Sequence, residues 1–497
     1  MRVVFIAALA ACVFQGCTSD DRATGAADLL LANVVVISPG GVPSPRMDVI
    51  VENGRILSVE KSAPRRSGFA RKTIDGSGKF LIPGLIDGHT HLNEVPGMNF
   101  EHERSYPDIS SAARSQIPRS YLYHGFTTVV DLNSTPGVIE QWNSLAVRPQ
   151  AYFCGASPVF DGYPMSWMPK PARYDIMPYF LFDESRSAEF PEGFDPSRHT
   201  PTAVVDRIRA DGGICVKTHY ERGFGGRGDL PVPTAALVKA LVGAAHAKKL
   251  PLLMHANSES AQSFGVDTGI DAFAHGMWTW NDRLLTEIHT DIEEIVNQTI
   301  VRDIALQPTI QVLYGEQDIH NPDYLDDPRL KRVLPGGLID WYRTDDGQWW
   351  RRRMLQVPIV SQLVEQGLWQ ELDAPPIARV SAVLEHFASN GGRLLFGSDT
   401  PSDPTFANPP GLNGRMEMDR WIAASVTPEQ LFLAATVNNA NFFGLGDEIG
   451  TIEAGKRADL LLLGENPLDS VSAYDTIEQV ILRGVVLHRS SLAADAD

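Results

Sequence analysis

The 497-residue sequence predicts an α/β fold, namely a (β/α)8 TIM barrel joined to a small β-sandwich. Between residues 83 and 446, apolar strand-like runs alternate with segments of helical periodicity, as in parallel sheets covered by helices. Residues 29–82 and 447–490 are instead rich in β-forming residues at both ends of the chain. Polar side chains also stand where several central strands end. We therefore expect a split β-sandwich, 29–82 with 447–490, attached to a barrel, 83–446.

The first 17 residues resemble a bacterial lipoprotein signal. Met1-Arg2 is basic, and the apolar run at 3–14 is too short to span a bilayer. It ends at Cys17 before a polar segment, so Cys17 is the expected lipidated residue and 18–28 a linker. Cys12 is an alternative, and so is an ordinary cleaved signal. In each case we expect an exported protein of the bacterial cell envelope. With lipid on Cys17 or Cys12, it would be tethered on the periplasmic or outer side.

Charge and cysteine content exclude several classes. Lys and Arg total 43 against 61 Asp and Glu, a net charge of -18. Such an acidic chain repels phosphate backbones, so no nucleic-acid partner is expected and a small-molecule substrate is favoured. Homo-oligomerisation stays open. Only Cys154 and Cys215 follow the signal, both in apolar runs, and we expect them to be buried free thiols.

The β-rich ends show hairpin patterns. Asn53-Gly54 favours a tight turn between strands at 47–51 and 55–59. The other end carries apolar runs at 455–463 and 479–487. Because neither end can bury a core alone, we expect them to pair with each other.

The central region supplies eight predicted strands. They cover residues 81–88, 125–132, 150–156, 214–218, 251–255, 270–275, 303–309 and 393–398. The helices predicted between and after them cover 138–145, 202–210, 234–249, 258–264, 291–301, 415–424 and 428–443. Two long stretches interrupt this alternation, an aromatic connection at 159–182 and an insertion at 313–369.

Metal-type ligands stand at five of the predicted strand ends. His89 and His91 share one face of the first strand because side chains repeat every second residue. Imidazoles arranged in this way can bind zinc. The other candidates are Lys217, His255, His275 and Asp399. Each alone has a structural alternative, such as a core histidine or a helix cap, but five such ends in one barrel favour a metal site.

Two segments resemble signatures of the amidohydrolase superfamily, PGLIDGHTH at 83–91 and GTIEAGKRADL at 450–460. The resemblance extends over essentially the whole mature chain and implies a barrel with a split β-sandwich. It also implies two divalent metal ions, most often zinc, and a CO2-derived carboxyl group on Lys217. The ligands that it implies are His89, His91, Lys217, His255, His275 and Asp399. His89, His91 and Asp399 would hold the more buried ion, and His255 and His275 the more exposed one.

Val216-Lys217 and Ala274-His275-Gly276 are most similar to the imidazolonepropionase-related branch, which includes Xaa-Pro and Xaa-Arg or Xaa-Lys dipeptidases. We therefore predict an exported hydrolase that cleaves an amide or peptide bond in a small substrate, a dipeptide or an N-acyl amino acid. Cyclic amides, lactones and phosphotriesters are alternative substrates for the same site. A non-catalytic surface binding protein is the alternative from another class.

Catalytic roles follow from that hypothesis. The metal ions would bring the pKa of a water near neutrality, and Asp399 would take its proton and pass it to the leaving amine. His275 or His219 would stabilise the oxyanion. Tyr220 and Arg222 are predicted to bind a substrate carboxylate.

Three further stretches bear on access to the site. The motif GFGGRG at 223–228 matches a dinucleotide fingerprint, but no helix is expected after it, so a mobile loop over the site is favoured. The aromatic connection carries Tyr163, Trp167 and Tyr174. The insertion carries Trp341, Trp349 and Trp350 before three arginines. Both stretches either cover the pocket or pack on the barrel.

Overall fold

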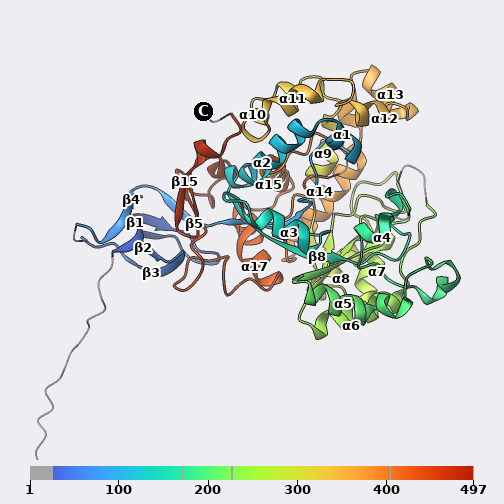
Figure 1. The fold of residues 1–497 in the computed structure, drawn as a ribbon, viewed down its shortest axis with the longest axis horizontal. Coiled ribbons are helices and arrows are strands. Elements are labelled where there is room, and N and C mark those ends of the chain that lie inside the picture. The colour runs from blue at the N-terminus through green and yellow to red at the C-terminus, as the bar shows by residue number, and fades with distance from the viewer. Residues whose placement is uncertain (1–25, 66, 171, 225–227, 403, 496–497) are drawn as a thin grey trace, which may run out of the picture.

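The computed structural model describes residues 26–65, 67–170, 172–224, 228–402 and 404–495 (Figure 1). The predicted lipoprotein signal, with Cys12 and Cys17, lies outside these residues. Within the described part of the chain, no helix has both the length and the apolar character needed to cross a bilayer.

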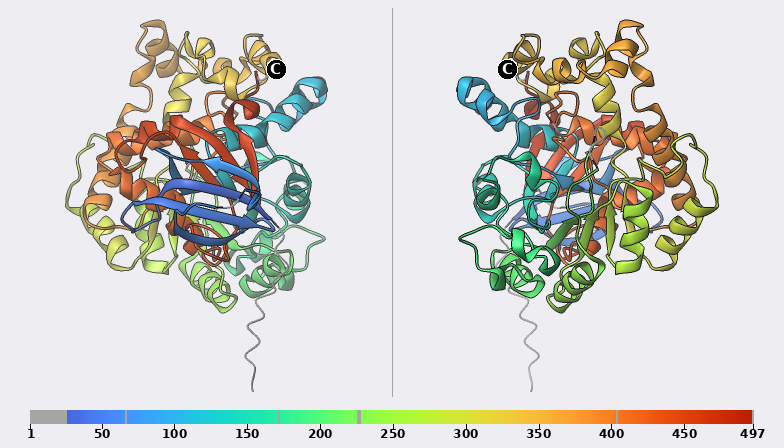
Figure 2. Two further views of the ribbon diagram at one scale, coloured as in Figure 1. Left: turned by 90° about the vertical axis from the view of Figure 1, so that its left-hand side faces the viewer. Right: turned by 90° about the vertical axis from the view of Figure 1, so that its right-hand side faces the viewer.

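The two ends of the chain share one sheet, as the sequence predicts. Its eight strands run in the order β15-β14-β13-β5-β1-β2-β3, and β4 pairs with β1. Their bounds are β1 Ala27–Val36, β2 Ser44–Glu52, β3 Arg55–Lys61, β4 Ala70–Asp75, β5 Phe80–Pro83, β13 Leu460–Leu463, β14 Ile477–Leu482 and β15 Val485–His488. The antiparallel pair β5–β13 joins the two ends, which lie side by side in Figure 2. Because these strands form one hydrogen-bonded sheet, the division into a two-sheet sandwich stays a prediction.

The second sheet is parallel and seven-stranded, in the order β12-β11-β10-β9-β8-β7-β6. Its strands are β6 Leu85–Thr90, β7 Phe126–Asp131, β8 Gln150–Ala156, β9 Cys215–His219, β10 Leu252–His255, β11 Ala272–Ala274 and β12 Ala305–Gln307. The sheet curls, and buried apolar residues of its strands, such as Ile86, Val130 and Leu253, belong to one apolar cluster. This arrangement is TIM-like, in agreement with the predicted alternation of strands and helices.

The predicted eighth strand, 393–398, does not form a continuous strand. Isolated parallel bridges instead link Leu394 to Leu306 and Thr400 to Thr90. The Leu395 amide donates to the Leu306 carbonyl at 3.0 Å, and the Asp399 amide donates to the His89 carbonyl at 2.8 Å. The segment 393–400 is thus hydrogen-bonded at both edges of the curled sheet.

Helices surround the parallel sheet (Figure 2). They are α1 Phe100–Ser105, α2 Pro107–Tyr123, α3 Pro136–Asn143, α4 Ala172–Ile176, α5 Pro201–Ala210, α6 Ala235–Ala247, α7 Glu259–Thr268, α8 Thr290–Val301, α9 Gln311–Asp318, α10 Leu330–Val333, α11 Gly336–Tyr342, α12 Trp349–Met354, α13 Pro358–Glu365, α14 Ala374–Ser389, α15 Leu412–Ala423, α16 Pro428–Leu433 and α17 Asn439–Phe442. The largest apolar cluster lies between these helices and the strands. Threonine caps begin α5 and α6 by accepting backbone amide hydrogen bonds at the third helical position.

The first predicted barrel strand, 81–88, is in fact divided between the two sheets. Phe80–Pro83 belongs to the sheet of the chain ends and Leu85–Thr90 to the parallel sheet, with Gly84 between them. A Cβ at Gly84 would lie 2.0 Å from the Thr127 hydroxyl oxygen. Only glycine therefore fits where the chain passes from one sheet to the other.

The insertion at 313–369 packs on the body of the protein. Its helices α10 and α11 bury Trp341 and Tyr342 against Met98 and Phe406 in a separate apolar cluster. The Tyr342 hydroxyl donates to the Pro96 carbonyl at 2.6 Å. Of the two alternatives for this insertion, packing on the barrel is therefore confirmed for its central part.

The expectation of free thiols was wrong. Cys154 on β8 and Cys215 on β9 are direct partners in the parallel register and form a disulfide, with Cα atoms 4.4 Å apart. The two residues are 61 positions apart in the sequence. Their proximity is decided by the register of neighbouring strands, which residue spacing does not reveal.

Replacing both cysteines with alanine should lower the thermal unfolding temperature, because the disulfide restricts a loop of about 60 residues in the unfolded chain. Loop-closure entropy predicts a loss of about 4 kcal/mol in the free energy of unfolding. Circular dichroism with and without reductant measures it. Reductant should lower the unfolding temperature of the natural chain but not that of Cys154→Ala/Cys215→Ala. Free thiols at both positions in peptide mapping of protein made under oxidising conditions would contradict the crosslink.

Candidate metal centre

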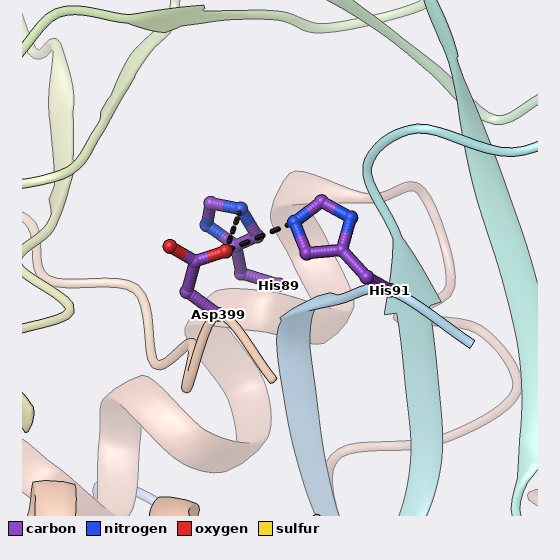
Figure 3. Close-up of side chains that lie close together, drawn as sticks. All are labelled: His89, His91 and Asp399. Carbon is purple, nitrogen blue, oxygen red and sulfur yellow. Dashed lines mark hydrogen bonds and ion pairs between the residues drawn. The ribbon is translucent and has the colours of Figure 1, made fainter. Parts of the chain in front are cut away.

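His89, His91 and Asp399 converge at one end of the parallel sheet (Figure 3). The Nε2 atoms of His89 and His91 lie 3.1 Å and 2.9 Å from the same carboxylate oxygen, Oδ1 of Asp399. One ligand atom from each of the three residues lies within 4.8 Å of the others. The strand-end pattern predicted this grouping, and the structure places these three predicted ligands together.

Burial and charge in this group favour a cation. Burial lowers the pKa of His89 to about 3, so its imidazole is neutral and able to coordinate. Burial alone would lower the pKa of His91 too, but the hydrogen bond to Asp399 raises it to about 9. Burial alone would raise the pKa of Asp399, yet His89 and His91 hold it well below its usual value. The carboxylate is therefore ionised and attracts positive charge between the two rings.

His275 connects this group to the other predicted ligands. Its ring centroid lies 5.1 Å from that of His89 and 4.5 Å from that of His255. Its Nδ1 is hydrogen-bonded to the Thr309 hydroxyl at 3.0 Å and lies 3.5 Å from Oδ2 of Asp399. The strands β6, β10 and β11 and the segment 393–400 thus bring these side chains to one site.

Lys217 lies on β9, buried within the sheet. Burial lowers the pKa of its amine to about 7, although the nearby Asp399 carboxylate opposes this shift. A lysine without a full positive charge is compatible with a metal site, whereas an ammonium group is not.

The donor set fits a divalent metal ion. The Nε2 atom of His255 is buried and has no hydrogen-bond partner among the described residues. A buried polar atom without a partner is costly, and coordination would satisfy it. Imidazole nitrogens with carboxylate oxygens are ligands that zinc accepts. His89, His91 and Asp399 would hold one ion, and His255, His275 and a modified Lys217 would be available to a second.

His219 is buried at the end of β9, with its ring 5.8 Å from that of His255. Tyr220, the next residue, points to the other side of the strand, because side chains alternate. Its ring packs on Phe264 of α7 at 4.4 Å, and Arg222 lies over the Tyr220 ring at 5.8 Å. The Tyr220 backbone amide donates to the His255 carbonyl at 2.9 Å, but no contact of the Tyr220 or Arg222 side chain with a metal-type ligand is found in the described part of the chain. The substrate-binding role predicted for these two side chains therefore gains no support.

Sequence reasoning missed three residues near the site. Thr309 orients His275, Glu221 places its Oε2 3.7 Å from Nε2 of His255, and Asp87 accepts hydrogen bonds from the Ser398 amide and hydroxyl. Burial raises the pKa of Asp87 to about 7, against the effect of Ser398. An acidic residue within the otherwise apolar predicted strand 81–88 was the available signal for Asp87. Nothing local marks Thr309.

Thr309→Val should weaken metal binding, because it removes the hydroxyl that is hydrogen-bonded to Nδ1 of His275 while keeping the β-branched shape. Partners of this kind typically change metal affinity by about 10- to 100-fold. Thr309→Ser is the matched control, because it keeps the hydroxyl. Competition with a metal-binding dye measures the affinities. Equal affinities in both variants and the natural chain would rule out the orienting role of Thr309.

Solved structures with this fold cover nearly the whole chain. A Xaa-Pro dipeptidase with bound methionine is 18% identical with a TM-score of 0.61, covering 93% of this chain and 99% of that one. Ochratoxinase from A. niger is 17% identical with a TM-score of 0.63, covering 95% and 99%. At such identities the likeness concerns the fold.

Sequence relatives match a shorter part. Dihydroorotase from Trichlorobacter lovleyi is 34% identical over 113 residues, which are 23% of this chain and 24% of that protein. The chain thus matches about a quarter of the length of such relatives.

Family models match most of the barrel. Two models, each described as amidohydrolase family, match residues 80–275 and 353–488. The first range contains His89, His91, Lys217, His255 and His275, and the second contains Asp399. The resemblance noted in the sequence is thereby confirmed: the chain belongs to the amidohydrolase superfamily.

Proposed function

We propose that this protein is a metal-dependent hydrolase that cleaves a carbon–nitrogen bond of an amide or cyclic amide. The observation that carries the proposal is the convergence of the His89 and His91 nitrogens on one oxygen of Asp399, beside His275, His255 and Lys217. Family membership and the relatives named dihydroorotase and allantoinase support it. Retention of every predicted ligand argues against a purely non-catalytic binding protein.

Within that class we favour a linear amide, in a dipeptide or an N-acyl amino acid. The support is the nearly complete overlap with a Xaa-Pro dipeptidase structure, together with the similarity of segments around Lys217 and His275 to the imidazolonepropionase-related branch. Cyclic amides are the second candidate, because the dihydroorotases match at higher identity over a shorter segment. A panel of dipeptides, N-acyl amino acids, dihydroorotate, lactones and phosphotriesters, assayed on zinc-loaded protein, tests the proposal. No hydrolysis of any amide would refute it.

The side chains have distinct roles in this reaction. Divalent ions, when bound, lower the pKa of a coordinated water and polarise the substrate carbonyl. Asp399 takes a proton on Oδ2, because Oδ1 is engaged by both His89 and His91, and delivers it to the leaving amine. Of the two predicted candidates, His219 would hold the substrate oxygen that gains negative charge, because His275 uses one nitrogen for Thr309 and the other for a metal ion.

Carboxylation of Lys217 is part of the proposal. Only a neutral amine adds to CO2, forming a carbamate and releasing one proton. Because burial brings the pKa of Lys217 to about 7, a large fraction of the amine is neutral near neutral pH. The carbamate would supply anionic oxygen ligands where an ammonium would repel a metal.

We also propose export and lipid attachment at Cys17. The support within the described residues is the Cys154–Cys215 disulfide, since such bonds persist in oxidising compartments. Mass spectrometry of the mature amino terminus should find an acylated cysteine at position 17. Acylation at Cys12 would move the site, and an unmodified terminus would refute lipid attachment.

Lys217→Ala should reduce the metal content and abolish turnover, because it removes the proposed carbamate ligand. Added acetate should restore part of both by supplying a carboxylate. Plasma mass spectrometry measures the metal. Lys248→Ala, which alters a half-exposed ion pair with Asp206, is the control and should retain both properties. Two ions per chain and normal turnover in Lys217→Ala would refute the role of Lys217 as a metal ligand.

Reconstitution of the metal-free protein should depend on bicarbonate and on pH. Below a pH of about 7 the Lys217 amine is protonated and does not add to CO2, so recovery should fall as the pH is lowered through that value. Recovery independent of bicarbonate and pH would contradict carboxylation.

Asp399→Asn should lower turnover far more than metal content, since an amide oxygen can still coordinate but takes no proton. The expected loss is about 100- to 10,000-fold. Because the pKa of Asp399 is held low, the natural enzyme should lose activity only at acid pH. The residual activity of the variant should fall less steeply as the pH is lowered, because it has no carboxylate at this position to protonate. Asp206→Asn, on the surface of α5, is the matched control. Full turnover in Asp399→Asn would show that Asp399 is not the proton carrier.

A further inference from the structure

We infer that the substrate carries an aromatic ring, or an apolar group of similar size, which packs on an aromatic wall next to His255. The aromatic wall consists of Tyr163, Trp167 and Phe224. This inference rests on the proposed function and specifies its substrate class.

The three rings of the aromatic wall contact one another. The centroid of Tyr163 lies 5.4 Å from those of both Trp167 and Phe224, and the latter two lie 5.9 Å apart. Their interplanar angles of 83°, 71° and 63° are those of edge-to-face packing. The wall therefore joins the aromatic connection at 159–182 to the loop after β9, which lie about 60 positions apart in the sequence.

The aromatic wall is continuous with the metal-type ligands. Tyr163 lies 4.7 Å from His255 and 5.8 Å from His219, ring centroid to ring centroid. Phe224 lies 6.4 Å from His255. An aromatic ring of the substrate that packs on the wall would thus lie next to the amide bond to be cleaved, which would be held at His255 and His275.

The outer rings of the wall are exposed to solvent. Trp167 is 51% exposed and Phe224 is 37% exposed. Among the described residues, Trp167 is the one tryptophan that is exposed. Contiguous exposed apolar surface at a functional site indicates binding, because covering it removes apolar area from water.

Charges around the wall favour a neutral group over a cation. Glu221 is buried and accepts from the Gly223 amide at 2.6 Å, close to His255. Asp161 is already bonded to Lys170, Arg173 and Tyr174. Because both carboxylates are engaged within the chain, neither is left to complete an aromatic cage for an ammonium group.

Turnover of matched substrates tests the inference. Zinc-loaded protein should hydrolyse N-acetyl-L-phenylalanine or N-benzoylglycine with kcat/KM about tenfold or more above N-acetylglycine, as expected for covering a phenyl ring. Phe224→Ala and Trp167→Ala should reduce this ratio. Phe100→Ala is the matched control: Phe100 is an exposed phenylalanine of α1 without a ring contact to the wall, and its variant should keep the ratio.

Binding measured by calorimetry separates this inference from the proposed function. If N-acetyl-L-phenylalanine binds more tightly than N-acetylglycine, and this difference is lost in Phe224→Ala, the aromatic wall is supported even when no amide is hydrolysed. The absence of hydrolysis would then refute only the proposed function. Hydrolysis without aromatic preference refutes only the wall, as does a preference for N-acetyl-L-lysine. Neither hydrolysis nor selective binding would overturn both.

Discussion

The contact of His89 and His91 with one shared oxygen of Asp399 is the interaction on which the rest of the structure depends. This oxygen is approached by His89 from β6 and by His91 just beyond that strand, while the Asp399 amide donates to the His89 carbonyl and the His91 amide donates to the Thr400 carbonyl. The same few atoms therefore attach the last segment of the curled sheet to its first strand and arrange the ligands. In this protein, the hydrogen bonds that join the segment 393–400 to β6 also bring the metal-type ligands together.

Burial decides the chemistry of this site. Burial makes the His89 imidazole neutral and lowers the pKa of the Lys217 amine to about 7, while the imidazoles keep Asp399 ionised. Asp87 strengthens the arrangement, because its carboxylate accepts two hydrogen bonds from Ser398, the residue before Asp399. The energetic cost of burying these polar groups is offset where they bond with one another. Nε2 of His255, which has no hydrogen-bond partner among the described residues and lies 3.7 Å from Oε2 of Glu221, would be satisfied by coordination to a metal ion.

The frame around the site holds segments distant in sequence. The sheet of the chain ends is joined through β5 and β13, and Gly84 lets the chain leave that sheet and enter the parallel one without a side-chain clash. The disulfide fixes β8 to β9 two residues before Lys217. Tyr163 and Trp167 of the aromatic wall come from one of the two long stretches that interrupt the repeating pattern, and the insertion is the other, while Phe224 comes from the loop after β9. These connections therefore distinguish this chain from a plain barrel.

The sequence by itself determined the alternation of strands and helices, the pairing of the two chain ends and the grouping of His89, His91 and Asp399. It did so because hydrophobic period and strand-end position are local properties. Tertiary structure alone decided the rest. The Cys154–Cys215 bond depends on strand register, and the division of the first strand depends on the space at Gly84. The part played by Thr309, the outward direction of Tyr220 and the contact of Tyr163 with Phe224 depend on segments that meet only in the folded chain. Such contacts are properties of pairs of residues far apart in sequence, and no single stretch records them.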